Sequence, residues 1–224
     1  MKKRYITFNT TLIKGIEDLG FKRKNKYDFR KELNDGLTCK LVFASYGIRP
    51  HITTYYILIH ITIPGLAESA EWIKSPNPHG DTNVTELGSL LPEKRFLFWD
   101  ICNEAPEEED VPKILDMINQ VKHYAVPYVE QFSTEEGIIR GIIGKTYGNG
   151  LLGGKYLCPY YLFLKGYNRE AIKYIEDHKR QLLKSYEEDE SKDYHWYETY
   201  VEITNQIYQK YNVTEEEIKK HYID

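Results

Sequence analysis

The stretch Ile52–Ile63 limits most strongly what this chain can fold into. One side of it carries Tyr55 followed by Ile57, Ile59, Ile61 and Ile63, while the other side mixes Thr, Tyr, Leu and His. Alternation with a period of two, in β-branched and aromatic residues, is typical of a strand with one face in a hydrophobic core. Pro64 and Gly65 stop it. We therefore expect an antiparallel sheet with one apolar face and one mixed polar face.

Three further segments predict strands beside this one. A strand over residues 27–33 leads into Asn34-Asp35-Gly36, a strong hairpin signal because these residue types tolerate positive φ. The return strand spans Leu37 to Tyr46, and a compact aromatic strand spans Phe96 to Ile101. Together these segments predict a β-meander of about four strands.

Apolar stripes at helical spacing predict helices around the sheet. Residues 8–19 carry such a stripe, which Asn9 or Thr10 can cap and Gly20 can end. The later part of the chain is helical in pattern, and Asn168 can cap its first long helix.

Two more helix boundaries are readable. Asp110 can cap a helix over residues 111–124, and Pro127 should end or kink it. Thr214 with Glu217 has the spacing of a capping box for a last short helix.

The fold class that follows is α+β: an antiparallel meander with helices on one face, then an α-helical C-terminal part. We expect a sheet domain over residues 1–147 and a helical region over residues 148–224, with the packing of the two as one domain left open.

Composition excludes some classes of function. The chain has 224 residues and a net charge of −4, so it is not built to coat nucleic acid. Its longest apolar run, Tyr55–Ile63, is too short to span a bilayer, so we expect no membrane partner. Three scattered cysteines and no apolar leader favour a reducing cytoplasm. Tyrosine stands out at 20 residues, a type that suits half-buried faces and interfaces.

Motifs for cofactors and metals are weak. Residues 148–153 match G-x-G-x-x-G, but no strand is evident in residues 134–147, so a glycine-rich hinge is favoured over a nucleotide site. Gly144-Lys145-Thr146 resembles the end of a P-loop, yet Ile139 stands where that loop needs glycine. The histidines are too dispersed to predict a metal site. We expect no cofactor.

The mixed face of the sheet is the candidate site. If the strands are neighbours in the assumed register, one face collects six polar or aromatic residues: Arg30, Glu32, Lys40, Tyr56, His60 and Asp100. Three interpretations compete. The face is simply solvated or covered by the C-terminal helices; or it binds another protein through Arg30, Lys40, Tyr56, His60 and Asp100; or it is a cleft in which Asp100 or Glu32 orients a catalytic His60.

A partial resemblance adds to this. Leu19-Gly20-Phe21-Lys22-Arg23-Lys24 and the following Phe29-Arg30 resemble the opening of an uncharacterised bacterial domain family, and Tyr124-Ala125-Val126-Pro127 is similar to its later helix. The resemblance covers about residues 8–135. It implies a helix leading into a strand meander and no established activity. Some similar small α+β proteins of bacteria serve as immunity partners of toxins, which implies a binding role.

We therefore expect a non-enzymatic cytoplasmic protein-binding module. The alternative is a hydrolase-like enzyme or small-ligand binder built on His60 and a neighbouring carboxylate.

Overall fold

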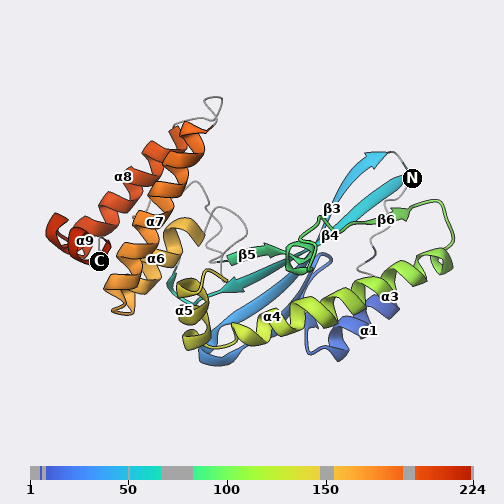
Figure 1. Cartoon of the computed structure of the whole chain (residues 1–224). Coiled ribbons are helices and arrows are strands. Elements are labelled where there is room, and N and C mark those ends of the chain that lie inside the picture. The colour runs from blue at the N-terminus through green and yellow to red at the C-terminus, as the bar shows by residue number, and fades with distance from the viewer. Residues whose placement is uncertain are drawn as a thin grey trace.

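The protein is described from a computed structural model that places residues 6, 9–49, 51–66, 83–146, 154–188 and 195–222. Its architecture is α+β, as the sequence predicts. A curled antiparallel sheet lies along a rod of helices, and the C-terminal helices gather beyond one end of the sheet (Figure 1).

Two long strands dominate the sheet. They are β3 (Thr38–Arg49) and β4 (Ile52–Thr62), paired antiparallel over almost their whole length. β2 (Asp28–Glu32) and the short β1 (Lys22–Arg23) extend the sheet on the β3 side. On the other side, β5 (Asn83–Glu86) and β6 (Trp99–Cys102) share the second edge of β4, each pairing with a different half of it. The meander is therefore confirmed, with two short strands in the place of the expected fourth.

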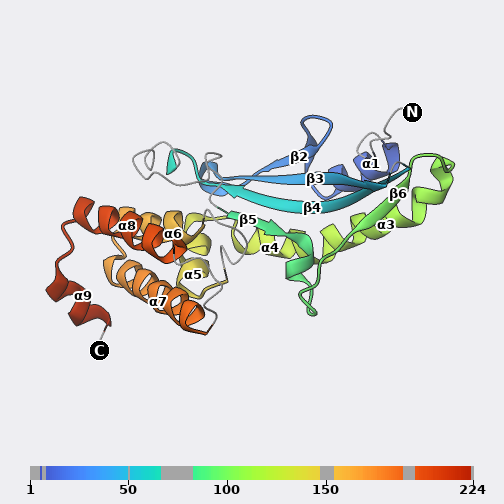
Figure 2. The ribbon, with the colours of Figure 1, turned by 90° about the horizontal axis from the view of Figure 1, so that it is seen from above.

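The apolar face of the sheet packs on helices from two parts of the chain. These are α1 (Thr10–Asp18), which contacts α3 (Val111–Gln120), and α4 (Val126–Gln131). A π-helical turn, η5 (Val121–Ala125), joins α3 to α4 without a break. Figure 2 shows these helices along one side of the sheet. Fully buried side chains from β2, β3, β4 and β6 meet this layer: Phe29, Leu41, Phe43, Ile57, Ile59, Ile61 and Ile101.

Several local predictions are confirmed in detail. The Asn34–Gly36 turn is a short 3-10 helix, η2, with positive φ at Asp35 (55°) and Gly36 (72°). The Asn9 side chain caps α1 by accepting hydrogen bonds from the backbone N–H groups of Thr11 and Leu12. At the far end of the chain, Thr214 and Glu217 form the reciprocal hydrogen bonds of a capping box at the start of α9 (Glu215–Tyr222).

Other local predictions are wrong. The fourth strand begins at Trp99 rather than Phe96, and residues 107–110 form a 3-10 helix, η4, in which Asp110 gives α3 no side-chain cap. Asn168 is the first helical residue of α7 and not its cap. Pro127 does not end the helix. In the π turn before it, the Val126 N–H donates to the Val121 carbonyl oxygen, so the α-helical hydrogen-bond pattern is already interrupted before the proline.

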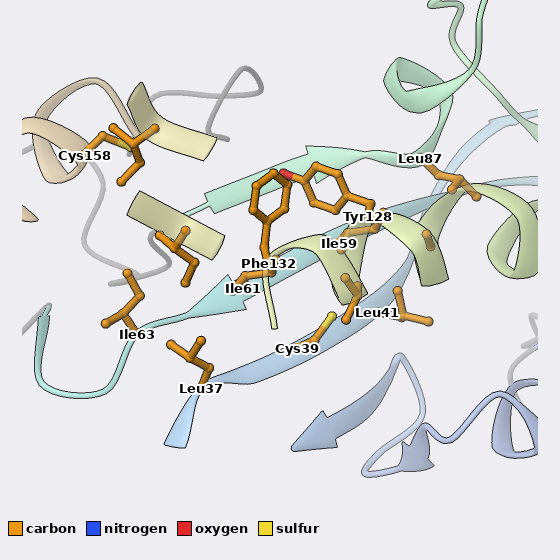
Figure 3. Close-up of a cluster of buried hydrophobic side chains, with 14 of the residues drawn as sticks. Leu37, Cys39, Leu41, Ile59, Ile61, Ile63, Leu87, Tyr128, Phe132 and Cys158 are labelled. Carbon is orange, nitrogen blue, oxygen red and sulfur yellow. The ribbon is translucent and has the colours of Figure 1, made fainter. Parts of the chain in front are cut away.

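The C-terminal part is an assembly of helices: α5 (Glu135–Ile143), α6 (Gly154–Leu164), α7 (Asn168–Glu187), α8 (His195–Lys210) and α9. Both views place α6 to α9 beyond the end of the sheet (Figures 1 and 2). One cluster of buried side chains runs from the sheet into these helices. Figure 3 shows Leu37 and Ile63 at the end of the sheet on the same side as Cys158 of α6. The proposed division at residues 147/148 stays a prediction.

Neighbouring residues on α3 offer a matched test of this core. Ile114 is fully buried, whereas Leu115 is 48% exposed. We expect Ile114→Ala to lower the free energy of unfolding by about 2–5 kcal/mol, because it removes buried methyl groups and leaves a cavity. Leu115→Ala should change it by less than about 0.5 kcal/mol. Urea unfolding followed by circular dichroism measures both, and equal losses would contradict this packing.

A buried histidine in the helical part predicts a pH effect. His178 of α7 packs edge-on against Tyr200 of α8, with ring centroids 4.6 Å apart. Burial lowers the pKa of His178 from 6.5 to about 4, helped by the charges of Lys155 and Lys145 and opposed by a hydrogen bond with Gln181.

Because the unfolded state binds this proton more tightly, we expect stability to be full above pH 6.5 and to fall as pH drops toward about 4. The upper limit for one proton is about 1.4 kcal/mol per pH unit, reduced here by the partial exposure of the ring. His178→Gln should flatten the pH dependence of the unfolding midpoint, with the exposed His123→Gln as the matched control. An unchanged pH profile in His178→Gln would contradict the assignment.

Candidate functional site

The face of the sheet opposite the core carries the candidate site, which we call the outer face. The register places Lys22, Arg30, Lys40 and His60 directly opposite one another on β1, β2, β3 and β4. These four side chains form a row that we call the basic row. Lys22 and Arg30 are exposed, and Lys40 and His60 are half-buried.

The basic row is only partly neutralised. Arg30 Nε lies 3.3 Å from Glu32 Oε1, two residues further along β2, and both side chains are largely exposed. An exposed pair of this kind is screened by solvent and salt, and contributes about 0–1 kcal/mol to stability. Lys22, Arg30 and Lys40 therefore give the row a net positive charge across three strands. Asp28 of β2 and Glu86 of β5 lie on the same face, opposite Val42 and Leu58.

Further along the same face, four aromatic side chains make a chain of contacts that we call the aromatic cluster. Tyr46 of β3 lies 6.0 Å from Tyr56 of β4 and 6.2 Å from Phe98, measured between ring centroids. Phe98 stacks on Phe96 with centroids 6.0 Å apart and planes 6° from parallel. Phe96 is 75% exposed, and Phe98 and Tyr46 are also exposed. Rings left this exposed have apolar area available for a partner.

The segment just before β6 carries Phe96 and Phe98, and its backbone position fixes this half of the aromatic cluster. Gly88 of η3 (Leu87–Leu90) allows a close backbone approach there, since a Cβ on it would lie 2.1 Å from the carbonyl oxygen of Arg95. β6 itself is fixed to α3, because the Trp99 indole N–H donates to Asp116 Oδ2 at 2.7 Å. With Trp99 buried, the alternation turns Phe98 to the outer face.

Apolar side chains connect the two ends of the site. Ala44 lies opposite Tyr56, and Val42 lies opposite Leu58, in the rows between the aromatic cluster and the basic row. Four residues separate Tyr56 from His60 along β4, or about 13 Å at the rise of a strand. The outer face thus reads, along β3 and β4, as aromatic, then aliphatic, then basic.

Asp100 lies at the aromatic end of this face and not beside His60. It is opposite Thr54 on β4, and its Oδ1 accepts a hydrogen bond from the Thr54 hydroxyl at 2.6 Å. Six residues separate Thr54 from His60, so the two sites are about 20 Å apart along the strand. Its backbone carbonyl also accepts a hydrogen bond from Lys113 of α3.

Glu32 does not supply the missing carboxylate. It lies opposite Thr38 on β3, two strands from β4 and so about 10 Å across the sheet from it, and it pairs with Arg30. The register therefore brings together Arg30, Lys40 and His60, sets Tyr56 further along, and leaves His60 without Asp100 or Glu32 as an orienting group. A base–carboxylate pair needs a separation of about 3 Å.

Elsewhere in the described residues, His51 Nδ1 lies 2.7 Å from Glu104 Oε1, but both side chains are more than half exposed, outside any enclosed site. Burial raises the pKa of the Cys39 thiol to about 12, partly offset by Lys31, and burial raises that of Cys158 to about 12 as well. Such thiols stay protonated and are poor nucleophiles. Across the described residues no group of His, Cys, Asp and Glu could hold a metal ion. The glycine motif at 148–153 lies outside the described residues.

Sequence reasoning missed three members of the aromatic cluster: Tyr46, Phe96 and Phe98. The signal was present, because Phe96 and Phe98 alternate with Leu97 and Trp99. What the sequence could not supply was the pairing of β6 with the first half of β4, which puts Phe98 beside Tyr46.

A pair of double-mutant cycles tests this geometry. Thr54→Val and Asp100→Ala should couple by about 1 kcal/mol in unfolding free energy, because each removes one partner of the shared hydrogen bond. The matched cycle of His60→Gln with Asp100→Ala should be additive within about 0.5 kcal/mol. Strong coupling in the second cycle would place His60 and Asp100 together and overturn the register.

Comparison with protein-family models, curated proteins and solved structures finds no match to this chain. Among the residues that the structure places, no helix is both long and apolar enough to cross a membrane.

Proposed function

We propose that this protein is a non-enzymatic protein-binding module that uses its outer face. The observation that carries the proposal is the aromatic cluster, in which Tyr46, Phe96 and Phe98 are exposed while touching one another. Interfaces are enriched in Tyr, Phe and Arg, and their binding energy is concentrated in a few such anchors.

The arrangement of charges defines the partner. The basic row lies about 13 Å from Tyr56, across the aliphatic strip of Val42, Ala44 and Leu58. A matching partner presents apolar or aromatic side chains to the aromatic cluster and carboxylates to Arg30 and Lys40. Complementary charges of this kind speed association and fix orientation more than they add affinity.

The location of the helices supports the same proposal. In Figure 2 the helices α1, α3 and α4 follow the apolar side of the sheet, and α6 to α9 lie beyond its end. No described helix covers the aromatic cluster, whose Phe96 remains 75% exposed. An immunity partner that blocks a toxin is one form such a module takes.

The hydrolase-like alternative receives less support. It needs a carboxylate within hydrogen-bonding distance of His60, and the Thr54–Asp100 hydrogen bond places Asp100 six residues away along β4.

Binding experiments with outer-face variants test the proposal. We expect a partner captured from the source cells by the wild-type protein to be lost with Tyr46→Ala/Phe98→Ala, because the anchors are removed. Lys40→Glu should weaken it by about tenfold, and binding should fall as salt rises. Surface plasmon resonance with the purified partner measures both effects.

Matched controls separate this surface from the rest of the molecule. Lys122→Glu makes the same charge change on η5, and Leu115→Ala removes an exposed apolar side chain from α3. Both should bind like the wild type. A partner that binds all variants equally would contradict the proposal, and so would sedimentation showing that the outer face is used only to pair two copies of this chain.

A further inference from the structure

The helical part contains a cavity that the outer face does not use. It has a volume of about 710 Å³ and lies between the end of α5, α6, α7 and the end of α9. This is within the range of pockets that hold small organic ligands, about 300–1,000 Å³. Three of the helices that line it, α6, α7 and α9, belong to the group of helices beyond the end of the sheet (Figure 1).

Cations line one side of the cavity. Arg169, Lys173 and Arg180 recur on α7 at intervals of four and seven residues, so they share a face of that helix, and all three are exposed. The side chains of Arg169 and Lys173 form no ion pair or hydrogen bond with any residue in the described part of the chain. Both lie in the first two turns of α7, where the helix dipole adds positive potential.

The acidic residues in the wall do not cancel this charge. Asp177 is engaged by Lys145, whose Nζ lies 2.8 Å from its Oδ2. Glu170 also lines the cavity, beside Arg169 in sequence. With Lys145 and Asp177 paired, three cations face one remaining carboxylate.

An apolar wall with one unsatisfied hydroxyl completes the cavity. Ile143, which is exposed, and the half-buried Tyr174 line it, and the Tyr222 ring lies under the Arg180 guanidinium, 4.7 Å from the ring centroid. The Tyr222 hydroxyl is buried and has no hydrogen-bond partner within the described residues. A buried polar atom of this kind normally has a partner in the functional state.

We propose that this cavity binds a small organic phosphate. The phosphate group contacts Arg169 and Lys173, because guanidinium and ammonium groups are the donors that proteins use for phosphate. The apolar part of the ligand lies on Ile143, Tyr174 and the Tyr222 ring, and a ligand oxygen accepts a hydrogen bond from the Tyr222 hydroxyl. Inorganic phosphate can make the contact with Arg169 and Lys173, but it has no apolar part to pack on the cavity wall.

Calorimetric titration with three simple probes tests both halves of the site. Phenyl phosphate should bind at least about tenfold more tightly than inorganic phosphate, and phenol should give no measurable binding. Raising salt from 50 to 500 mM should weaken phenyl phosphate binding, since the contact is largely electrostatic. Equal binding of phenyl phosphate and inorganic phosphate would overturn the organic half of the proposal, and no binding of either at millimolar concentration would overturn all of it.

Variants then assign the binding to this cavity. Arg169→Gln/Lys173→Gln should weaken phenyl phosphate by about tenfold or more, because two charged contacts are lost. Arg140→Gln, an exposed arginine of α5 paired with Glu136 and absent from the cavity wall, is the matched control and should bind like the wild type. Since Arg169 and Lys173 are exposed, the double variant should keep the wild-type melting temperature without ligand. Unchanged binding in the double variant would contradict the site.

Discussion

The pairing of β3 with β4 is the constraint on which the rest of the structure depends. The two strands match residue for residue from Thr38 with Thr62 to Gly47 with Thr53. Because side chains alternate along a strand, this register commits every second residue of both strands to the core at once. A slip by one residue would turn Ile57, Ile59 and Ile61 to solvent.

The same register also places the residues of the outer face. The stability of the core and the arrangement of the candidate site therefore depend on the same pairing of β3 with β4. Leu41 and Ile59 are opposite each other in the core, and one residue away Lys40 and His60 are opposite each other outside. The packing of the core therefore also fixes the positions of the residues in the basic row. The aromatic cluster needs one thing more, the pairing of β6 with β4 and its attachment to α3 through Trp99 and Asp116.

Much of the sheet could be predicted because its signals are local. Asn34-Asp35-Gly36 fixed the hairpin, and the alternation of Ile52–Ile63 fixed which side of β4 is buried. β1 and β5 escaped prediction because two and four residues are too few to display a period. Helix α5 lies in the part of the chain predicted to be helical, but its bounds were not predicted because it contains Gly137 and Gly141, poor helix formers. Gly137 is required by packing, since a Cβ there would lie 2.4 Å from the Gln131 carbonyl oxygen.

The candidate site was likewise predictable only where local alternation decides which face a residue lies on. Alternation alone put Arg30, Lys40, Tyr56 and His60 on one face, but it could not tell that β6 pairs with the first half of β4. For that reason one of the three interpretations could place Asp100 beside His60, whereas it lies beside Thr54. Long-range pairing is decided by packing between distant segments, which no single stretch of sequence records.

The π turn at Val121–Ala125 has a mechanical consequence. By accommodating Pro127 it lets residues 111–131 form one continuous helical rod, about 30 Å long, instead of two helices with a loop between them. One end of this rod holds β6 through Asp116, and Tyr128 near the other end contacts β5 through Thr85 at 3.0 Å. β6 and β5, which pair with different halves of β4, are therefore also joined to each other through a single helical segment on the opposite side of the core.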